Sequence, residues 1–229
     1  MKGIVIPVKA FGQAKSRLWR FVSPGRCAAL AEAMCSDVLV SASRASGVDK
    51  IIVVSNEPRA LAAARANGWD ALQEQTQVSE SASVDMASRY CESIGVTSLL
   101  RLPGDVPLVQ SSDIEDIFCA AGRAPGCVIV PSRDGTGTNA LLRSPPTAFA
   151  SHFGKDSFTK HLAAARAADI PVSVVRNPRL ELDVDELSDI KLLLQQVSPH
   201  SHTGKWLSET DRELWRGSDP ALSLRDPLN

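Results

Sequence analysis

Short apolar runs rich in β-branched residues alternate along this chain with longer segments of helical periodicity. The apolar runs have the length of buried strands, and they predict strands at residues 3–8, 50–55, 97–102, 126–131, 138–143 and 171–175. The longer segments between them place apolar residues on one face, as amphipathic helices do. Because strands and helices alternate, the pattern predicts a three-layer α/β/α domain around a mostly parallel sheet.

Capping residues mark where the predicted helices begin. Ser23 and the proline after it predict a helix over residues 24–45. Ser112 and Glu115 have the spacing of a capping box, which predicts a helix over residues 113–121.

The composition changes after the last predicted helix, at residues 186–196. Residues 1–197 are therefore predicted to form one domain, and residues 198–229 a tail rich in serine and proline. Trp206 and Trp215 lie nine positions apart in this tail, which is compatible with a short docking helix or with loosely ordered chain.

Length and charge narrow the class of protein. The 229 residues suffice for one well-buried core, and 25 basic against 26 acidic side chains provide no broad basic field, so we expect no nucleic-acid partner. Five cysteines without a C-x-x-C pair predict reduced, buried thiols. With no leader pattern and no long apolar run, we expect a cytoplasmic protein that does not bind membranes. The sequence does not decide the oligomeric state, and a homodimer is one option.

The strongest local signal is a carboxylate at the end of a buried strand. The apolar run 97–102 stops at a Pro-Gly turn that carries Asp105. In open α/β sheets ligands bind beyond the carboxyl ends of the strands, so Asp105 is placed for a metal or a polar substrate. A plain turn is the alternative, because aspartate favours turns through its own side-chain hydrogen bonds.

Three cations crowd the loop after the first predicted strand, at Lys9, Lys15 and Arg17. Such a loop could wrap a polyphosphate. It matches neither the G-x-x-x-x-G-K-[ST] nor the G-x-G-x-x-G spacing. Taken alone, the segment is more typical of a solvated basic loop than of a phosphate-binding one.

Two glycine-containing segments are candidates for binding an anion. In residues 131–139 two glycines let backbone amides approach an anion, and threonines add hydroxyl donors. A hairpin turn is the alternative, but the length of the segment argues against it, because a tight turn needs only two residues. Residues 152–158 lead into a helix ending near residue 168, where free N–H groups and Ser157 would hold a phosphate or carboxylate, unless Ser157 only caps the helix. His161 is expected on the surface of that helix.

Two acids, Asp183 and Asp185, stand two positions apart near the end of the chain. Strand alternation would put both carboxylates on one face, directly before the helix at residues 186–196. One could cap that helix while the other joins Asp105. Carboxylate oxygens are the hard ligands that Mg²⁺ prefers, and it takes one or two of them together with substrate phosphates.

Five motifs follow one another along residues 1–197: Ile6-Pro7-Val8-Lys9 with Lys15-Ser16-Arg17-Leu18, Leu102-Pro103-Gly104-Asp105-Val106-Pro107, Asp134-Gly135-Thr136-Gly137-Thr138-Asn139, Phe153-Gly154-Lys155-Asp156-Ser157 and Leu182-Asp183-Val184-Asp185-Glu186. In this order they resemble the 2-phospho-L-lactate guanylyltransferase family. The resemblance implies a nucleotidyltransferase fold, like that of nucleotide-diphospho-sugar transferases. It also implies transfer of GMP from GTP to a phosphorylated three-carbon acid in coenzyme F-420 biosynthesis. The acid is 2-phospho-L-lactate, phosphoenolpyruvate or 3-phosphoglycerate, depending on the member.

The resemblance implies roles for individual residues as well. Asp105, with Asp183 or Asp185, would hold Mg²⁺. The acid would be bound by Thr138, Asn139, Gly154 and Ser157. The nucleotide would be contacted by Pro7, Val8, Lys9, Lys15 and Gly104. Catalysis would depend on Lys15, Arg17 and Asp105. The attacking phosphate oxygen is already anionic near neutral pH, so positioning and charge neutralisation would carry the reaction without a general base.

Two other functions remain open at the level of sequence. Residues 78–84 replace a Gly-Leu-Asn stretch found in many members, which leaves room for another nucleotidyltransferase, such as a cytidylyltransferase acting on a sugar or polyol phosphate. The second is a non-catalytic nucleotide-binding regulator whose tail docks on a partner through Trp206 and Trp215.

Overall fold

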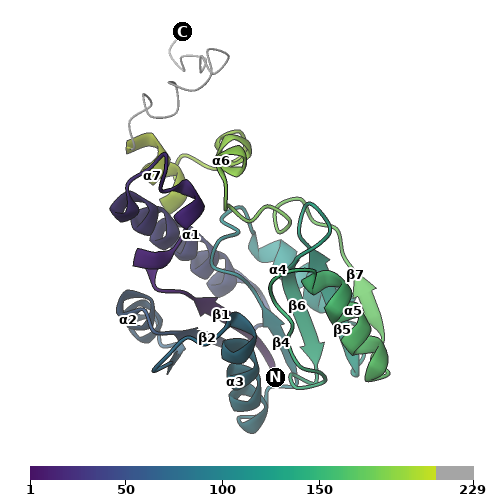
Figure 1. Cartoon of the computed structure of the whole chain (residues 1–229). Helices are drawn as coiled ribbons and strands as arrows, with labels where there is room; N and C mark the ends of the chain where they lie inside the picture. The colour runs from purple at the N-terminus through teal and green to yellow at the C-terminus, as the bar shows by residue number, and fades with distance from the viewer. Residues whose placement is uncertain (210–229) are drawn as a thin grey trace.

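A seven-stranded sheet in the order β3-β2-β1-β4-β6-β5-β7 organises residues 1–209, which the computed structural model describes (Figure 1). Its strands are β1 (Lys2–Val8), β2 (Lys50–Ser55), β3 (Asp70–Gln73), β4 (Ser98–Arg101), β5 (Gly126–Pro131), β6 (Thr138–Ser144) and β7 (Val172–Val174). Strand β6 runs antiparallel to β4 and β5, and the other neighbouring pairs are parallel. The prediction of a mostly parallel sheet is confirmed.

Helices cover both faces of the sheet. They are α1 (Pro24–Arg44), α2 (Pro58–Ala66), α3 (Glu80–Ser93), α4 (Ser111–Ala120), α5 (Ser157–Ala167), α6 (Leu187–Leu194) and α7 (His202–Glu209), with short 3-10 helices at Phe11–Gln13 and Ser16–Leu18. One apolar cluster packs α1, α2 and α4 against one face of the sheet, and two further clusters pack α3 and α5 against the other. This is the three-layer arrangement that the sequence predicts.

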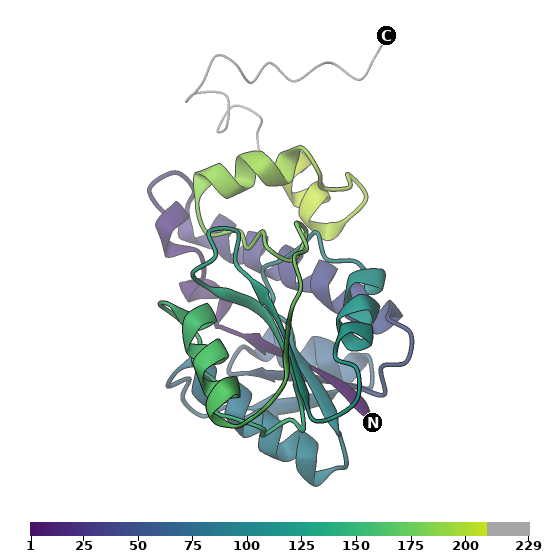
Figure 2. The ribbon, with the colours of Figure 1, turned by 90° about the vertical axis from the view of Figure 1, so that its right-hand side faces the viewer.

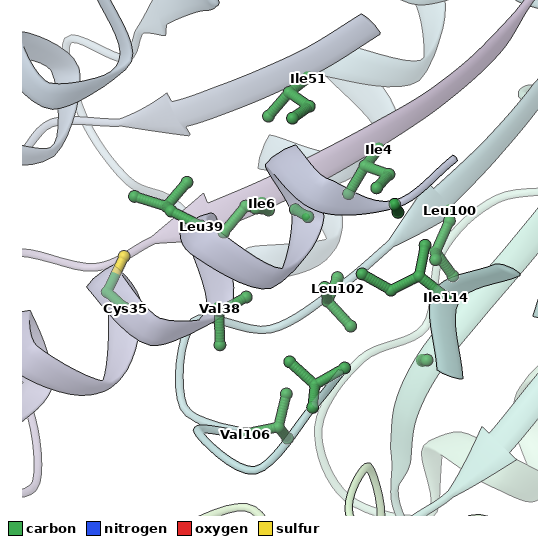
Figure 3. Packing of buried hydrophobic residues seen from close by; sticks show 14 of the residues in the cluster. Ile4, Ile6, Cys35, Val38, Leu39, Ile51, Leu100, Leu102, Val106 and Ile114 are labelled. Atoms are coloured by element: carbon green, nitrogen blue, oxygen red, sulfur yellow. The ribbon is translucent and has the colours of Figure 1, made fainter. Parts of the chain in front are cut away.

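Strand β1 shows why the predicted strands read as continuous apolar runs. Ile4 and Ile6 point toward α1 and α4, where Figure 3 shows them with Val38 and Ile114. Val5, between them, belongs to the cluster beneath α3 on the opposite face. Successive side chains alternate between faces, and both faces are covered, so positions 4–8 of the strand are all apolar.

The structure corrects several predicted boundaries. Helix α4 begins at residue 111, and its capping box joins Gln110 and Asp113 in place of Ser112 and Glu115. Glu115 accepts instead the backbone N–H of Ser46, at 2.8 Å, in another part of the fold. At α1 the proline stands at the first turn as predicted, but the preceding serine makes no side-chain cap. These helices are held mainly by their buried faces, so a cap one or two residues away serves as well.

All five cysteines are free. Four are buried as expected, but Cys119 is exposed near the end of α4, because it faces away from the sheet. Within residues 1–209, no helix combines the length and the apolar character needed to cross a membrane.

Helix α7 lies beside α1 and α6 at one end of the molecule (Figures 1 and 2). Leu207 is buried in a cluster that also contains Leu30 of α1 and Ile190 of α6, and Trp206 packs against its edge. The second tryptophan of the predicted docking segment, Trp215, lies outside the described residues.

We expect Asp37→Ala to loosen α7. The buried Asp37 carboxylate accepts the N–H groups of His202 and Thr203, each at 2.8 Å, and so caps the first turn of α7. Loss of such a cap costs about 1–2 kcal/mol of unfolding free energy. Urea unfolding of the variant checks this, with Asp116→Ala, at an exposed position of α4, as a surface control. An unchanged midpoint would show that α7 contributes no stability through Asp37.

Candidate active site

Two adjoining hollows open beyond the carboxyl ends of β1 and β4. The first is lined by the loop after β1 and by Gly104, and it contains the predicted nucleotide residues Pro7, Val8, Lys9 and Lys15. The second is lined by the predicted acid-binding residues Thr138, Asn139, Gly154 and Ser157, together with Asp183. Both hollows share a wall that contains Lys9, Arg17, Glu80, Arg101, Asp105 and Asp185. The chain therefore brings every predicted site residue to one crevice.

Lys15 ties the distant acids together. Its backbone has a φ of 56°, and its Nζ donates to Asp105 Oδ2 at 2.7 Å and to Asp185 Oδ1 at 2.9 Å. The lysine side chain is only 6% exposed. Burial alone would lower the pKa of Lys15, but the charges of the two carboxylates raise it above its ordinary value. Lys15 is therefore an internal counter-ion, whereas Lys9 and the largely exposed Arg17 are open to a ligand.

The segment that carries Asp183 and Asp185 is not the strand that was predicted. Its backbone bonds with loops: the Val184 N–H donates to the Asp105 carbonyl at 3.2 Å, and the Asp185 N–H donates to the Asp189 carboxylate at 3.1 Å. The cap of α6 is a box formed by Glu186 and Asp189, so Asp185 is not the cap. Its carboxylate is free to contact Lys15.

The three aspartates have different electrostatic surroundings. Burial would raise the pKa of Asp105, but Lys15 and Arg101 lower it below its usual range. Burial raises the pKa of Asp183, and the negative charge of Asp105 raises it further, although the Asn139 amide donates to Asp183 Oδ1 at 3.2 Å. Asp183 is thus a carboxylate whose negative charge is not fully balanced by its neighbours.

This donor set fits a divalent cation. Two carboxylates, Asp105 and Asp183, repel each other at the junction of the hollows, and a cation between them would remove the repulsion. Residues 1–209 contain no cluster of three or more histidine, cysteine or acidic side chains arranged for a metal. A cation here would therefore complete its ligands with substrate oxygens and water, as Mg²⁺ commonly does.

We expect Asp183→Asn to stabilise the metal-free protein. An acid with a raised folded-state pKa costs stability above that pKa, where it is charged, and costs nothing once it is protonated. The asparagine removes this charge and still accepts from Asn139, so the melting temperature should rise by about 1–3 °C at pH 7 in EDTA. Thermal melts at pH 7 and pH 4 check this. A lower melting temperature at pH 7, or a gain that persists at pH 4, would contradict it.

The segment at residues 132–137 is a hairpin connection, because it joins the antiparallel strands β5 and β6. The argument from length against a hairpin was wrong. Most amides of the segment already have acceptors: Asp134 accepts the Thr136 N–H, the Ser132 hydroxyl accepts the Gly137 N–H, and the Arg133 N–H donates to the Glu181 carbonyl at 3.1 Å. Hydrogen bonds from Ser132 and Thr136 lower the pKa of Asp134 to about 2. The loop therefore shapes the acid-side hollow and leaves few amides for a ligand.

The start of α5 forms another wall of this hollow. Gly154 has a φ of +108°, a conformation that L side chains rarely adopt, and a Cβ added there would meet no atom within 4 Å. Glycine is thus required by the backbone angle, and the space above it stays open to a ligand. Ser157 stands at the first turn of α5 and is 2% exposed. It lies where helix N-terminal amides favour an anion.

Arg101 is a site residue that the sequence reasoning missed. Its guanidinium donates to the Asn139 carbonyl at 2.9 Å, pairs with Glu80 and lies 4.3 Å from the centre of the Phe153 ring. Burial lowers its pKa to about 10. Arg101 lines both hollows. A charged residue inside the apolar run 97–102 was the sequence signal that could have identified it.

His161 is also placed differently from the prediction. Its ring is fully buried behind Thr138, at 0% exposure, and not on the surface of α5. It contacts the Phe153 ring edge-on at a centroid distance of 4.9 Å. The surface assignment was wrong because α5 turns this position toward the loop at residues 149–153.

The sheet topology is that of a nucleotidyltransferase fold. A nucleotide-diphospho-sugar transferase structure from Desulfovibrio desulfuricans G20 matches with a TM-score of 0.76 at 18% identity, covering 94% of this chain and 97% of that one. A 4-diphosphocytidyl-2C-methyl-D-erythritol synthase from Anaerococcus prevotii matches with a TM-score of 0.59 at 13% identity, covering 91% and 96%. At these identities the likeness concerns the fold alone.

Sequence comparison gives the family. The chain belongs to the family described as "Guanylyl transferase CofC like", which matches residues 1–209. It is 36% identical over 218 residues to a phosphoenolpyruvate guanylyltransferase from Roseiflexus sp. RS-1, covering 94% of this chain and 96% of that protein. It is 31% identical over 224 residues to a 2-phospho-L-lactate guanylyltransferase from Methanothermobacter thermautotrophicus, covering 97% and 98%. The resemblance inferred from the five motifs is confirmed.

Proposed function

We propose that this protein transfers GMP from GTP to a phosphorylated three-carbon acid and releases pyrophosphate. A phosphate oxygen of the acid attacks the α-phosphorus of GTP, a new P–O bond forms, and the bond to the pyrophosphate leaving group breaks. The observation that carries the proposal is the shared wall of the two hollows, where Asp105 stands between the cationic loop after β1 and the hollow lined by Gly154 and Ser157 at the start of α5. The family resemblance supports a role for this reaction in coenzyme F-420 biosynthesis.

The residues divide the work by their position. Lys9 and Arg17 bind triphosphate oxygens on one side, and Thr138, Gly154 and Ser157 bind the acid on the other. The main role of Lys15 is not to bind substrate. Its ammonium group holds the carboxylates of Asp105 and Asp185 in place across the crevice. Bringing two polyanions together is the main barrier, so fixed positive charge and positioning supply the rate enhancement.

Asp105 and Asp183 are the residues that would hold Mg²⁺. Of the two acids that the sequence left open, we favour Asp183, because it faces the charge of Asp105 and makes no salt bridge of its own within residues 1–209. When bound, the ion would supply positive charge to phosphate oxygens at the reacting centre.

Phosphoenolpyruvate is the acid we propose first. The curated relatives at 34–36% identity include phosphoenolpyruvate guanylyltransferases from Roseiflexus and Conexibacter woesei. All three candidate acids carry a carboxylate and a phosphate, which suits a hollow with cations on one side and hydroxyl and amide donors on the other.

Pyrophosphate release, measured with each of GTP, CTP, UTP and ATP against each of the three acids and against a sugar phosphate, tests the proposal. We expect rapid release with GTP and phosphoenolpyruvate in Mg²⁺, and none in excess EDTA. Release with CTP and a sugar phosphate would favour the cytidylyltransferase alternative. Tight GTP binding without turnover would favour the regulator.

A further inference from the structure

His161 has a fixed arrangement of hydrogen bonds behind the acid-side hollow. Its Nε2 accepts the backbone N–H of His152 at 2.8 Å, and its Nδ1 lies 3.0 Å from Thr138 Oγ1. A backbone N–H can only donate, so Nε2 carries no proton. In a neutral imidazole the proton is then on Nδ1, which donates to the Thr138 hydroxyl oxygen. Burial and the charge of Arg143 lower the pKa of His161 to about 3, which keeps the ring neutral.

This arrangement decides what the Thr138 hydroxyl can do. Its oxygen receives the proton of His161, and within residues 1–209 its own hydrogen has no protein acceptor. Thr138 lines the acid-side hollow with Gly154 and Ser157. A phosphate or carboxylate offers only acceptor oxygens, so a hydroxyl helps to bind it only by donating.

We propose that His161 is a positioning residue that fixes Thr138 as a hydrogen-bond donor to the anionic acid substrate. This inference rests on the proposed function and adds a residue to its acid site. A neutral histidine suits the role better than a hydroxyl or an amide, because its ring sits between two partners and can donate to only one of them. A hydrogen bond donated to a charged group changes affinity by about tenfold or more.

The tautomer can be measured on the wild-type protein. The chain has four histidines, and ¹⁵N-histidine NMR compared with His161→Gln assigns the buried ring. We expect the Nδ1–H tautomer at pH 7. An Nε2–H tautomer or a charged ring would overturn the proposal without any assay of activity.

A double-mutant cycle tests the action through Thr138. Glutamine at position 161 keeps an acceptor near the ε position and removes the δ donor, and Thr138→Val removes the hydroxyl with little change in shape. We expect each single variant to raise the KM for the acid about tenfold, with the KM for GTP changed less than twofold. Because both act through one hydrogen bond, the double variant should be no worse than Thr138→Val alone.

Two further variants keep the result interpretable. Thr138→Ser restores the hydroxyl and should recover most of the KM for the acid that Thr138→Val loses, whereas His161→Asn retains a donor near the δ position and should raise that KM less than His161→Gln does. Additive effects, or an equal rise in the KM for GTP, would show a merely structural role. Absence of any GMP transfer by the wild-type protein would instead refute the proposed function itself, and the inference with it.

Discussion

Asp105→Asn is expected to reduce GMP transfer by about 10²–10³-fold while the fold survives. The variant removes negative charge at the wall shared by both hollows, where we propose that Mg²⁺ and the reacting phosphates meet. The asparagine has the same shape, and Lys15 keeps its second partner, Asp185, at 2.9 Å. Initial rates of pyrophosphate release at saturating GTP, with circular dichroism as a folding check, measure the effect.

Asp185→Asn is the matched control for this prediction. It removes the other partner of Lys15 but leaves the proposed metal pair, Asp105 and Asp183, intact, so the rate should fall about tenfold at most. The assignment of Asp105 and Asp183 would be wrong if Asp105→Asn retained more than a tenth of the wild-type rate. It would also be wrong if Asp185→Asn reduced the rate more than Asp105→Asn does.

Lys15→Met is expected to damage both stability and activity. The substitution leaves Asp105 and Asp185 facing each other without their shared counter-ion. Breaking a buried ion pair costs several kcal/mol, but both carboxylates are at least a third exposed, so we expect a loss of about 2 kcal/mol and a fall in melting temperature of about 4–8 °C. Because Asp105 would also leave its working position, kcat/KM for GTP should fall about a hundredfold.

The pH dependence of this stability loss follows from the pKa directions. The lowered pKa of Asp105 contributes stability above the ordinary carboxyl range, and this is lost as pH falls through the folded-state pKa. The raised pKa of Lys15 contributes stability that persists until pH rises above the ordinary lysine range. The gap between wild type and Lys15→Met should therefore be widest near neutral pH and close in acid.

Lys9→Met provides the comparison for the lysine. Lys9 is exposed in the same crevice, so its loss should weaken GTP binding with little change in melting temperature. Equal melting curves for wild type and Lys15→Met would contradict the counter-ion role of Lys15.

The sequence predicts those parts of the fold in which burial alone determines where a strand begins and ends. Strands β2 and β5 match their predicted bounds because both faces of each are covered, so the apolar run and the strand coincide. Strand β3 was missed, since Asp70–Gln73 lies at the edge of the sheet, is only half-buried and has no β-branched residue.

The site, like the fold, has features that the sequence predicts and features that it does not. Motif order predicted which residues meet, because loops after parallel strands gather at one sheet edge. It could not predict that Lys15 pairs with two acids, that Arg101 joins both hollows or that His161 is buried behind Thr138. Each of these depends on side-chain direction across segments far apart in the chain, which no local pattern records.

Mass spectrometry of the protein with GTP, Mg²⁺ and an equal mixture of the three acids tests the central claim most directly. We predict an ion whose mass equals phosphoenolpyruvate plus a GMP group, formed together with pyrophosphate and formed about 10²–10³-fold more slowly when Asp105→Asn replaces the wild type. If the GTP concentration saturates the protein and GTP still remains unchanged, with no guanylylated acid formed, the assignment of this crevice as a guanylyltransferase site is contradicted.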